Sequence, residues 1–104
     1  IAGGYDKNLD YTPIAKPVVD KVSDLILIGQ TAGKIFDKVK EESERQGKNI
    51  AISMCDTLQE AIDVAKKSAK RGDVVLFSPA SASFDMFKDF ADRGRKFKKM
   101  VNDL

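Results

Sequence analysis

The stretch Asp24-Leu-Ile-Leu-Ile-Gly29 is apolar at four consecutive positions between a carboxylate and a glycine. Two further stretches, Asn49-Ile-Ala-Ile-Ser-Met54 and Asp73-Val-Val-Leu-Phe-Ser78, have the same length and a similar enrichment in apolar, largely β-branched residues. A short run that is apolar at nearly every position is typical of a strand covered on both faces. The three runs therefore predict strands of a parallel sheet.

Helical patterns occupy the segments between these runs. Thr12-Pro13 joins an N-cap residue to a proline at the first helical position, and Pro17 then predicts a helix that is kinked or begins late. Thr31 is predicted to cap a second helix that extends to Gln46, where Gly47 ends it.

Two more helices are predicted from a capping pattern and from an apolar stripe. Thr57-Leu-Gln-Glu60 has the capping-box spacing, and Gly72 is the predicted end of that helix. Ser83 is the predicted N-cap of the final helix. Its apolar stripe recurs at steps of four and three residues, at Phe90, Gly94, Phe97, Val101 and Leu104. We interpret the glycine on this stripe as close packing against the sheet, with a helix break as the alternative.

Strands that alternate with helices in this way predict an α/β, Rossmann-like three-layer domain with a mostly parallel sheet. Ile1-Ala2 runs directly into Gly3-Gly4, and we interpret it as the end of a further strand that is truncated. Since no initiator Met precedes it, we expect an excised domain; a processed natural N-terminus is the alternative. The 104 residues form one domain, because two cores of half this size would be too small.

Composition excludes several kinds of site. Lys and Arg number 18 against 16 Asp and Glu, so the net charge is +2 and predicts no strong field for nucleic acid. The absence of histidine excludes Ser-His-Asp and Cys-His catalysis, and the single Cys55 excludes an internal disulfide or a cysteine metal site. No apolar run approaches the roughly 20 residues of a membrane-spanning helix, so we expect no membrane partner.

Ligands of such sheets bind beyond the carboxyl ends of the strands, which selects the loops 3–12, 29–31, 54–57 and 78–83. Gly29-Gln-Thr-Ala-Gly33-Lys34 resembles a phosphate-binding P-loop but has three residues between the glycines instead of four. Ile35 also stands where a magnesium-binding Ser or Thr is needed. We therefore expect an ordinary strand-to-helix turn there.

Two other loops carry groups that suit an anionic ligand. Gly3-Gly4-Tyr5-Asp6-Lys7 combines glycines, which allow close backbone approach, with a flexible cation; a solvated turn is the alternative. Ser78-Pro-Ala-Ser-Ala-Ser83 leads into the last helix, whose N-terminus would favour an anion; plain capping by Ser83 is the alternative. For most of Phe84, Phe87 and Phe90 we expect core packing. The basic run 93–99 is most simply the exposed face of a helix.

Four stretches together resemble the carboxyl-terminal domain of a Mur ligase, in the branch that adds D-glutamate. They are Gly3-Gly4-Tyr5-Asp6-Lys7, Asp10-Tyr11-Thr12-Pro13, the serine-rich stretch 78–90, and Arg93-Gly94. The resemblance covers essentially the whole chain, and the serine-rich stretch is its most specific part.

The resemblance implies a three-domain cytoplasmic ligase of peptidoglycan synthesis, and hence a role in cell-wall biogenesis, cell shape and cell division. The first domain would bind UDP-N-acetylmuramoyl-L-alanine, the central domain ATP and Mg²⁺, and residues 1–104 D-glutamate. ATP would phosphorylate the substrate carboxylate, and the amine of D-glutamate would attack that acyl phosphate to form an amide. The resemblance further implies a monomer, with no cofactor in residues 1–104 and no ligase activity from this part alone.

Carried over by motif, the D-glutamate contacts are Lys7, Ser83 and Phe90, with Phe84 beside Ser83 lining the same pocket. Lysine neutralises a carboxylate and a serine hydroxyl donates a hydrogen bond to one, whereas Phe90 contributes its backbone N–H if the turn leaves it free. These groups hold the nucleophile and perform no acid–base chemistry, so no catalytic residue and no metal ligand is expected.

Two positions depart from the family pattern: Ser81 stands where relatives often have Cys, and Asp89 where Asn is frequent. Two functions from other classes remain as alternatives. The first is a stand-alone Rossmann-like module that binds a small anion or acts as a phospho-receiver, although Asp24 and Asp73 begin their strands rather than end them. The second is a scaffold or RNA-binding domain, for which only the basic run 93–99 argues.

Overall fold

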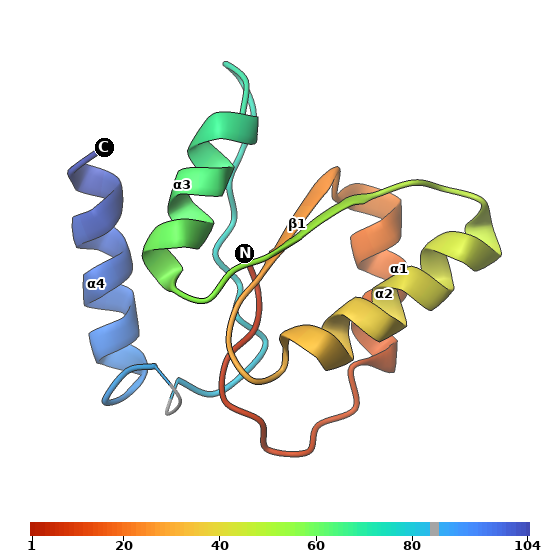
Figure 1. The fold of residues 1–104 in the computed structure, drawn as a ribbon, viewed down its shortest axis with the longest axis horizontal. Helices are drawn as coiled ribbons and strands as arrows, with labels where there is room; N and C mark the ends of the chain where they lie inside the picture. Colours follow the sequence, from red (N-terminus) through yellow and green to blue (C-terminus); the bar gives the residue numbers. More distant parts are fainter. Residues whose placement is uncertain (84–85) are drawn as a thin grey trace.

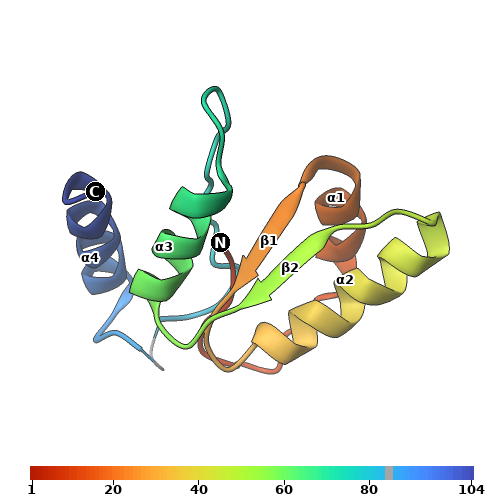
Figure 2. The same cartoon turned by 45° about the horizontal axis from the view of Figure 1, so that its top comes forward.

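The computed structural model describes residues 1–83 and 86–104 and has two parallel strands between pairs of helices. The elements follow one another as α1 (Thr12–Lys21), β1 (Asp24–Leu27), α2 (Ala32–Gln46), β2 (Ala51–Met54), α3 (Leu58–Ser68) and α4 (Phe90–Asn102). β1 pairs with β2 in parallel, from Asp24 opposite Ala51 to Leu27 opposite Met54. Figure 1 shows the ribbon, and Figure 2 shows the two strands side by side.

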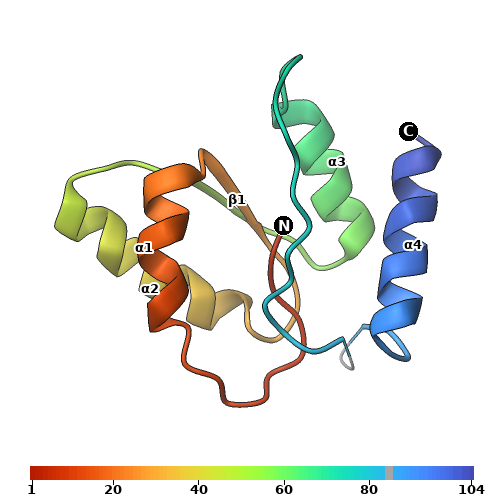
Figure 3. The ribbon, with the colours of Figure 1, turned by 180° about the vertical axis from the view of Figure 1, so that it is seen from behind.

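β1 lies between two helical layers, as the run of apolar residues predicts. Leu25 and Leu27 belong to a core shared with α1 and α2, whereas Ile26 and Ile28 belong to a second core built mainly on α3. Figure 3 shows α1 and α2 on one side of β1 and α3 and α4 on the other. Burying each of these side chains contributes about 1.5–3 kcal/mol, so β1 organises both cores. The prediction of an α/β, Rossmann-like domain is confirmed.

Residues 1–3 continue the sheet on the other edge of β1. Ala2 forms a parallel bridge with Leu27, and its backbone exchanges hydrogen bonds of 2.9 Å with Ile26 and Ile28. The prediction that Ile1-Ala2 is strand-like is therefore confirmed, although only Ala2 is formally bridged to β1.

The predicted strand over Asp73–Ser78 is wrong as a regular strand. Only its second half is paired, through the carbonyl of Leu76 and the N–H of Ser78, which bond to Ile1. No strand among residues 1–83 or 86–104 pairs with its first half: Asp73 bonds to Lys70 in the preceding turn, and Val74 is 89% exposed. A strand needs a neighbouring backbone along its length, and here the neighbour is only two or three residues long.

The starts of α1 and α2 differ from the predicted capping. α1 begins at Thr12 and runs through Pro17, so it does not begin late. Its N-cap is Tyr11, and Asp10 accepts hydrogen bonds from both the N–H and the hydroxyl of Thr12. Thr31 is the N-cap residue of α2, but its side chain makes no capping bond. Gly47 ends α2 in the left-handed region, as predicted.

The capping of α3 is confirmed, whereas its end is not where the sequence places it. The hydroxyl of Thr57 accepts a hydrogen bond from the N–H of Glu60, and the Glu60 carboxylate accepts one from the N–H of Asp56. The helix ends at Ser68, and Ala69 is already extended. Gly72, the predicted end, lies in the turn that follows.

α4 differs most from its prediction. Asp89, not Ser83, is its N-cap and accepts a hydrogen bond of 2.8 Å from the N–H of Asp92. The predicted stripe is only partly buried: Phe90 is 78% exposed, whereas Phe97 of the stripe packs against the core beside α3, together with Met100 from outside it. A Cβ on Gly94 would meet nothing within 4 Å, so close packing does not explain this glycine.

Candidate functional site

The four loops selected from the sequence lie at one edge of the molecule. They follow the carboxyl ends of residues 1–2, β1, β2 and the extended segment before Pro79, and they lie in the lower half of Figure 1. Tyr5 forms an antiparallel bridge with Ala82, and the N–H of Gly3 donates to the carbonyl of Pro79. The glycine loop and the serine-rich loop are therefore direct neighbours.

The two glycines are required for this approach. Gly3 has a φ of +111°, and a Cβ there would overlap the carbonyl of Ile28. A Cβ on Gly4 would overlap the carbonyl of Ala82 and lie 3.1 Å from the Cβ of Ser81. Any larger residue would push the loops apart, so glycine at both positions sets their spacing.

Three hydroxyl groups tie these loops together; we call Tyr11, Thr31 and Ser81 the hydroxyl cluster. The Ser81 hydroxyl lies 2.7 Å from the Tyr11 hydroxyl and 2.9 Å from that of Thr31. The fully buried Thr31 also accepts a hydrogen bond of 3.0 Å from the N–H of Gly4, and its own N–H donates to the carbonyl of Gly4. The cluster thus joins the glycine loop, the start of α2 and the serine-rich loop.

Sequence reasoning missed this cluster. The position of Thr31 before α2 predicts a helix cap, and Tyr11 and Ser81 are distant from it in sequence, so no local pattern indicates their contact. The side chain of Arg93 adds a further tie from α4, donating to the carbonyl of Ser81 at 2.8 Å. The only local signal was the pattern of small and hydroxyl-bearing residues in the serine-rich stretch.

Ser83 is buried and its hydroxyl is unused by the described structure. The residue is 3% exposed, and its carbonyl accepts hydrogen bonds from the N–H groups of Met86 and Phe87. Its Oγ, however, forms no hydrogen bond with residues 1–83 or 86–104. Buried polar groups are nearly always hydrogen-bonded, so a buried hydroxyl without a partner among these residues is unusual.

Lys7 lies on the glycine loop two residues beyond Tyr5, on an exposed stretch. Asp6 shapes this loop: its carboxylate accepts from the N–H of Asn8 at 2.8 Å and pairs with Lys34 at 2.7 Å. The hydrogen bond to Lys34 is the main reason that the pKa of Asp6 lies below its ordinary value. Lys34, which in sequence belongs to the P-loop-like pattern, thus brings a second cation to this edge.

Phe90 is the first residue of α4, and no described group accepts a hydrogen bond from its N–H. The rest of this helix end already carries acidic side chains. Asp92 accepts from the N–H of Lys88 at 3.1 Å, which is the largest cause of its lowered pKa, and pairs with Lys96 at 3.2 Å. These carboxylates compete with any anion at the N-terminus of α4, so the helix dipole offers less to a ligand than the sequence suggested. Phe84 lies outside the described residues.

The turn that resembles a P-loop in sequence does not have the geometry of a phosphate cradle in the described structure. At the start of α2, the N–H of Thr31 already bonds to Gly4 and that of Ala32 to Gly29, so the turn presents no full cradle of free amides. Across residues 1–83 and 86–104, no three His, Cys, Asp or Glu side chains gather closely enough to hold a metal ion. A helix with the length and apolar character to cross a membrane is likewise not found in this part of the chain.

Comparison with known proteins places the chain in a family. No family model matches it. Over its whole length it is 52% identical to UDP-N-acetylmuramoylalanine–D-glutamate ligase of Acetivibrio thermocellus and 44% identical to that of Clostridium tetani. It is 50% identical to the enzyme of the same name from Clostridium acetobutylicum. The chain spans only 22–23% of the length of these curated relatives. The chain therefore belongs to the Mur ligase family, as a part similar to the carboxyl-terminal domain of the D-glutamate ligases.

Proposed function

We propose that these 104 residues form the D-glutamate-binding domain of a three-domain ligase that makes an amide bond in peptidoglycan synthesis. Two observations support this function. The relatives that match the whole chain are named as D-glutamate ligases. The buried hydroxyl of Ser83, which no described residue uses, lies one residue from the bridge between the glycine loop and the serine-rich loop, and this observation carries the proposal.

D-glutamate brings two carboxylates and an amine that must lose its proton before it attacks. In the proposed complex, Lys7 neutralises one carboxylate, and the hydroxyl of Ser83 and the N–H of Phe90 donate hydrogen bonds. Phe84, which follows Ser83 in the sequence, is the fourth residue of the proposed contact set. None of these groups is a general base, so the domain contributes through positioning: it holds the amine where the activated partner arrives.

ATP, Mg²⁺ and UDP-N-acetylmuramoyl-L-alanine are bound elsewhere in the proposed enzyme. The start of α2 does not fit a nucleotide phosphate, so no step that uses ATP is assigned to residues 1–104. We further propose that the enzyme acts as a monomer in the cytoplasm, in cell-wall biogenesis, and that the domain alone has no ligase activity. Robust ATP-dependent turnover by the purified 104-residue chain would contradict this last point.

The test is a pair of substitutions in a full-length ligase that carries this domain. Lys7→Ala and Ser83→Ala each remove a charge-assisted contact of about 1.5–3 kcal/mol, so the KM for D-glutamate should rise roughly ten- to a hundredfold. The KM for ATP should change little. Lys66→Ala, in the last turn of α3, is the matched control for loss of a cation and should change neither constant. Unchanged D-glutamate kinetics in both site variants would remove these residues from the site.

A further inference from the structure

The turn that carries Lys7 is shaped by the residue before it. One carboxylate oxygen of Asp6 accepts a hydrogen bond of 2.8 Å from the N–H of Asn8, which closes a short turn with Lys7 at its centre. Asn8 has a φ of +59°, a left-handed conformation that turns the chain back after Lys7. The direction in which the turn presents Lys7 therefore depends on the carboxylate of Asp6.

The start of α2 holds the same turn from the side. The N–H of Asp6 donates to the side-chain oxygen of Gln30 at 3.1 Å. The second carboxylate oxygen of Asp6 lies 2.7 Å from the ammonium of Lys34, which belongs to the first turn of α2. One oxygen of Asp6 thus shapes the turn, and the other is neutralised by a cation from a different element.

The needs of α2 do not explain why Lys34 lies here. A cation in the first turn of a helix opposes the helix dipole, and the first turn of α2 contains no acidic residue to offset it. The side chains of Lys34 and Asp6 are 48% and 24% exposed, and ion pairs with this exposure add little to stability. The main effect of the pair is consequently on the charge beside Lys7.

An unpaired Asp6 would weaken an anion site at this turn. Asp6 and Lys7 are consecutive, so salt screens their charges only in part, because the screening length at physiological ionic strength is about 8 Å. A bare carboxylate would offset the charge of Lys7 and repel a ligand that carries two carboxylates. With Lys34 bound to Asp6, the pair is neutral and the net charge of the three side chains is that of Lys7.

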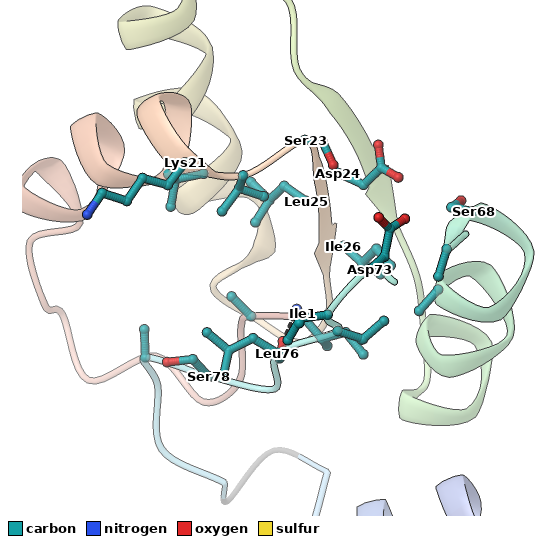
Figure 4. A pocket seen from close by; sticks show the side chains of 18 of the residues that line it. Ile1, Lys21, Ser23, Asp24, Leu25, Ile26, Ser68, Asp73, Leu76 and Ser78 are labelled. Carbon is teal, nitrogen blue, oxygen red and sulfur yellow. Dashed lines mark hydrogen bonds between the residues drawn. The ribbon is translucent and has the colours of Figure 1, made fainter. Parts of the chain in front are cut away.

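The opposite end of β1 has a different balance of charge. A cavity of about 640 Å³ there is lined mainly by apolar residues, and its charged side chains are Lys21, Asp24 and Asp73 (Figure 4). Two carboxylates and one ammonium do not favour a dicarboxylate. The described charges therefore favour such a ligand at the edge with Lys7 and Lys34.

We propose that Lys34 is a positioning residue for D-glutamate: by neutralising Asp6, it lets the turn present the ammonium of Lys7 to a carboxylate of the ligand. Lys34 acts through Asp6 and needs no contact with the ligand itself. This inference rests on the proposed binding of D-glutamate by Lys7.

Substitution of Lys34 in the full-length ligase tests the proposal. Lys34→Met keeps a long side chain without its charge, so the KM for D-glutamate should rise about three- to tenfold. The kcat and the KM for ATP should stay within about twofold of the parent values. Lys34→Arg, which keeps the charge, should retain the parent KM for D-glutamate. Lys40→Met is the matched control on the same helix, because the ammonium of Lys40 lies over the ring of Phe36, and it should change none of these constants.

The double variant Asp6→Asn with Lys34→Met separates neutralisation from other roles. Asparagine keeps an oxygen that can close the turn but carries no charge, so the KM for D-glutamate should return to the parent value. A parent-like KM in Lys34→Met alone would overturn the proposal. So would a double variant as impaired as Lys34→Met, because Lys34 would then contact D-glutamate or merely hold the loop. Failure of the proposed function is distinguishable, since Lys7→Ala would then leave the KM for D-glutamate unchanged.

Discussion

The two ends of β1 are built in contrasting ways. Beyond its carboxyl end, the backbone of Gly4 and the hydroxyl cluster satisfy one another, and the loops are held at a fixed spacing. At its amino end, the surrounding surface is mainly apolar, and Val74 is almost fully exposed. The comparison teaches that polar contacts hold the loops together at the site edge, whereas the opposite edge keeps apolar side chains exposed.

The largest effect should come from breaking the close approach at the site edge. Gly3→Ala places a Cβ against the carbonyl of Ile28 at a φ of +111° and should destabilise the fold by about 3 kcal/mol. Gly33→Ala is the matched control, because a Cβ there meets nothing within 4 Å; in a helix it should stabilise by about 0.5–1 kcal/mol. Urea unfolding measures both values, and equal effects would mean that the loops are not tightly packed.

A smaller loss is expected when the hydroxyl cluster is cut. Thr31→Val keeps the shape of the side chain but leaves the buried N–H of Gly4 without its acceptor, which should cost about 1–3 kcal/mol. Thr31→Ser should restore most of this loss, since it returns the hydroxyl. The same unfolding experiment compares the three proteins. If the valine variant matched the parent, the cluster would not be holding the loops.

The smallest effect concerns the amino-terminal edge and appears as a dependence on pH. Burial lowers the pKa of the Ile1 amino group below its ordinary value of 8.0. At pH values between this lowered pKa and 8.0, the unfolded chain binds more protons than the folded chain. The free energy of unfolding should therefore rise with pH in this range and level off above pH 8.0. Acetylation of Ile1 should abolish this slope. Unfolding curves at about pH 6 to 9 test it, and equal slopes for both forms would contradict the burial of the charge.

Local sequence was sufficient wherever a structure depends on neighbours in the chain. The capping of α3 by Thr57 was predicted correctly because donor and acceptor lie three residues apart. The end of α2 at Gly47 was predicted because a left-handed residue there strongly favours glycine. The four candidate loops were predicted to lie at one edge because parallel strands share a direction, so their carboxyl ends lie on the same side of the sheet.

The features that the sequence did not predict depend on residues that are far apart in the chain. Ser83 looked like a helix cap, but Asp89 caps α4, and Ser83 lies buried in the preceding turn. The stripe from Phe90 to Leu104 was periodic, yet α4 meets α3 mainly through Phe97 and Met100. Periodicity shows that a helix has an apolar face, but it does not show how much of that face packs against the rest of the protein.

By itself the sequence determined the α/β order, the two-sided burial of β1 and the family to which the chain belongs. Each of these depends on residues that are close together in the chain or on a recognisable sequence motif. Only the tertiary structure decided that Thr31 joins two loops instead of capping a helix, and that the first half of Asp73–Ser78 finds no partner strand in the described chain. The physical reason is common to both cases: a hydrogen bond forms only where a distant part of the chain brings a partner, and local preference does not specify that partner.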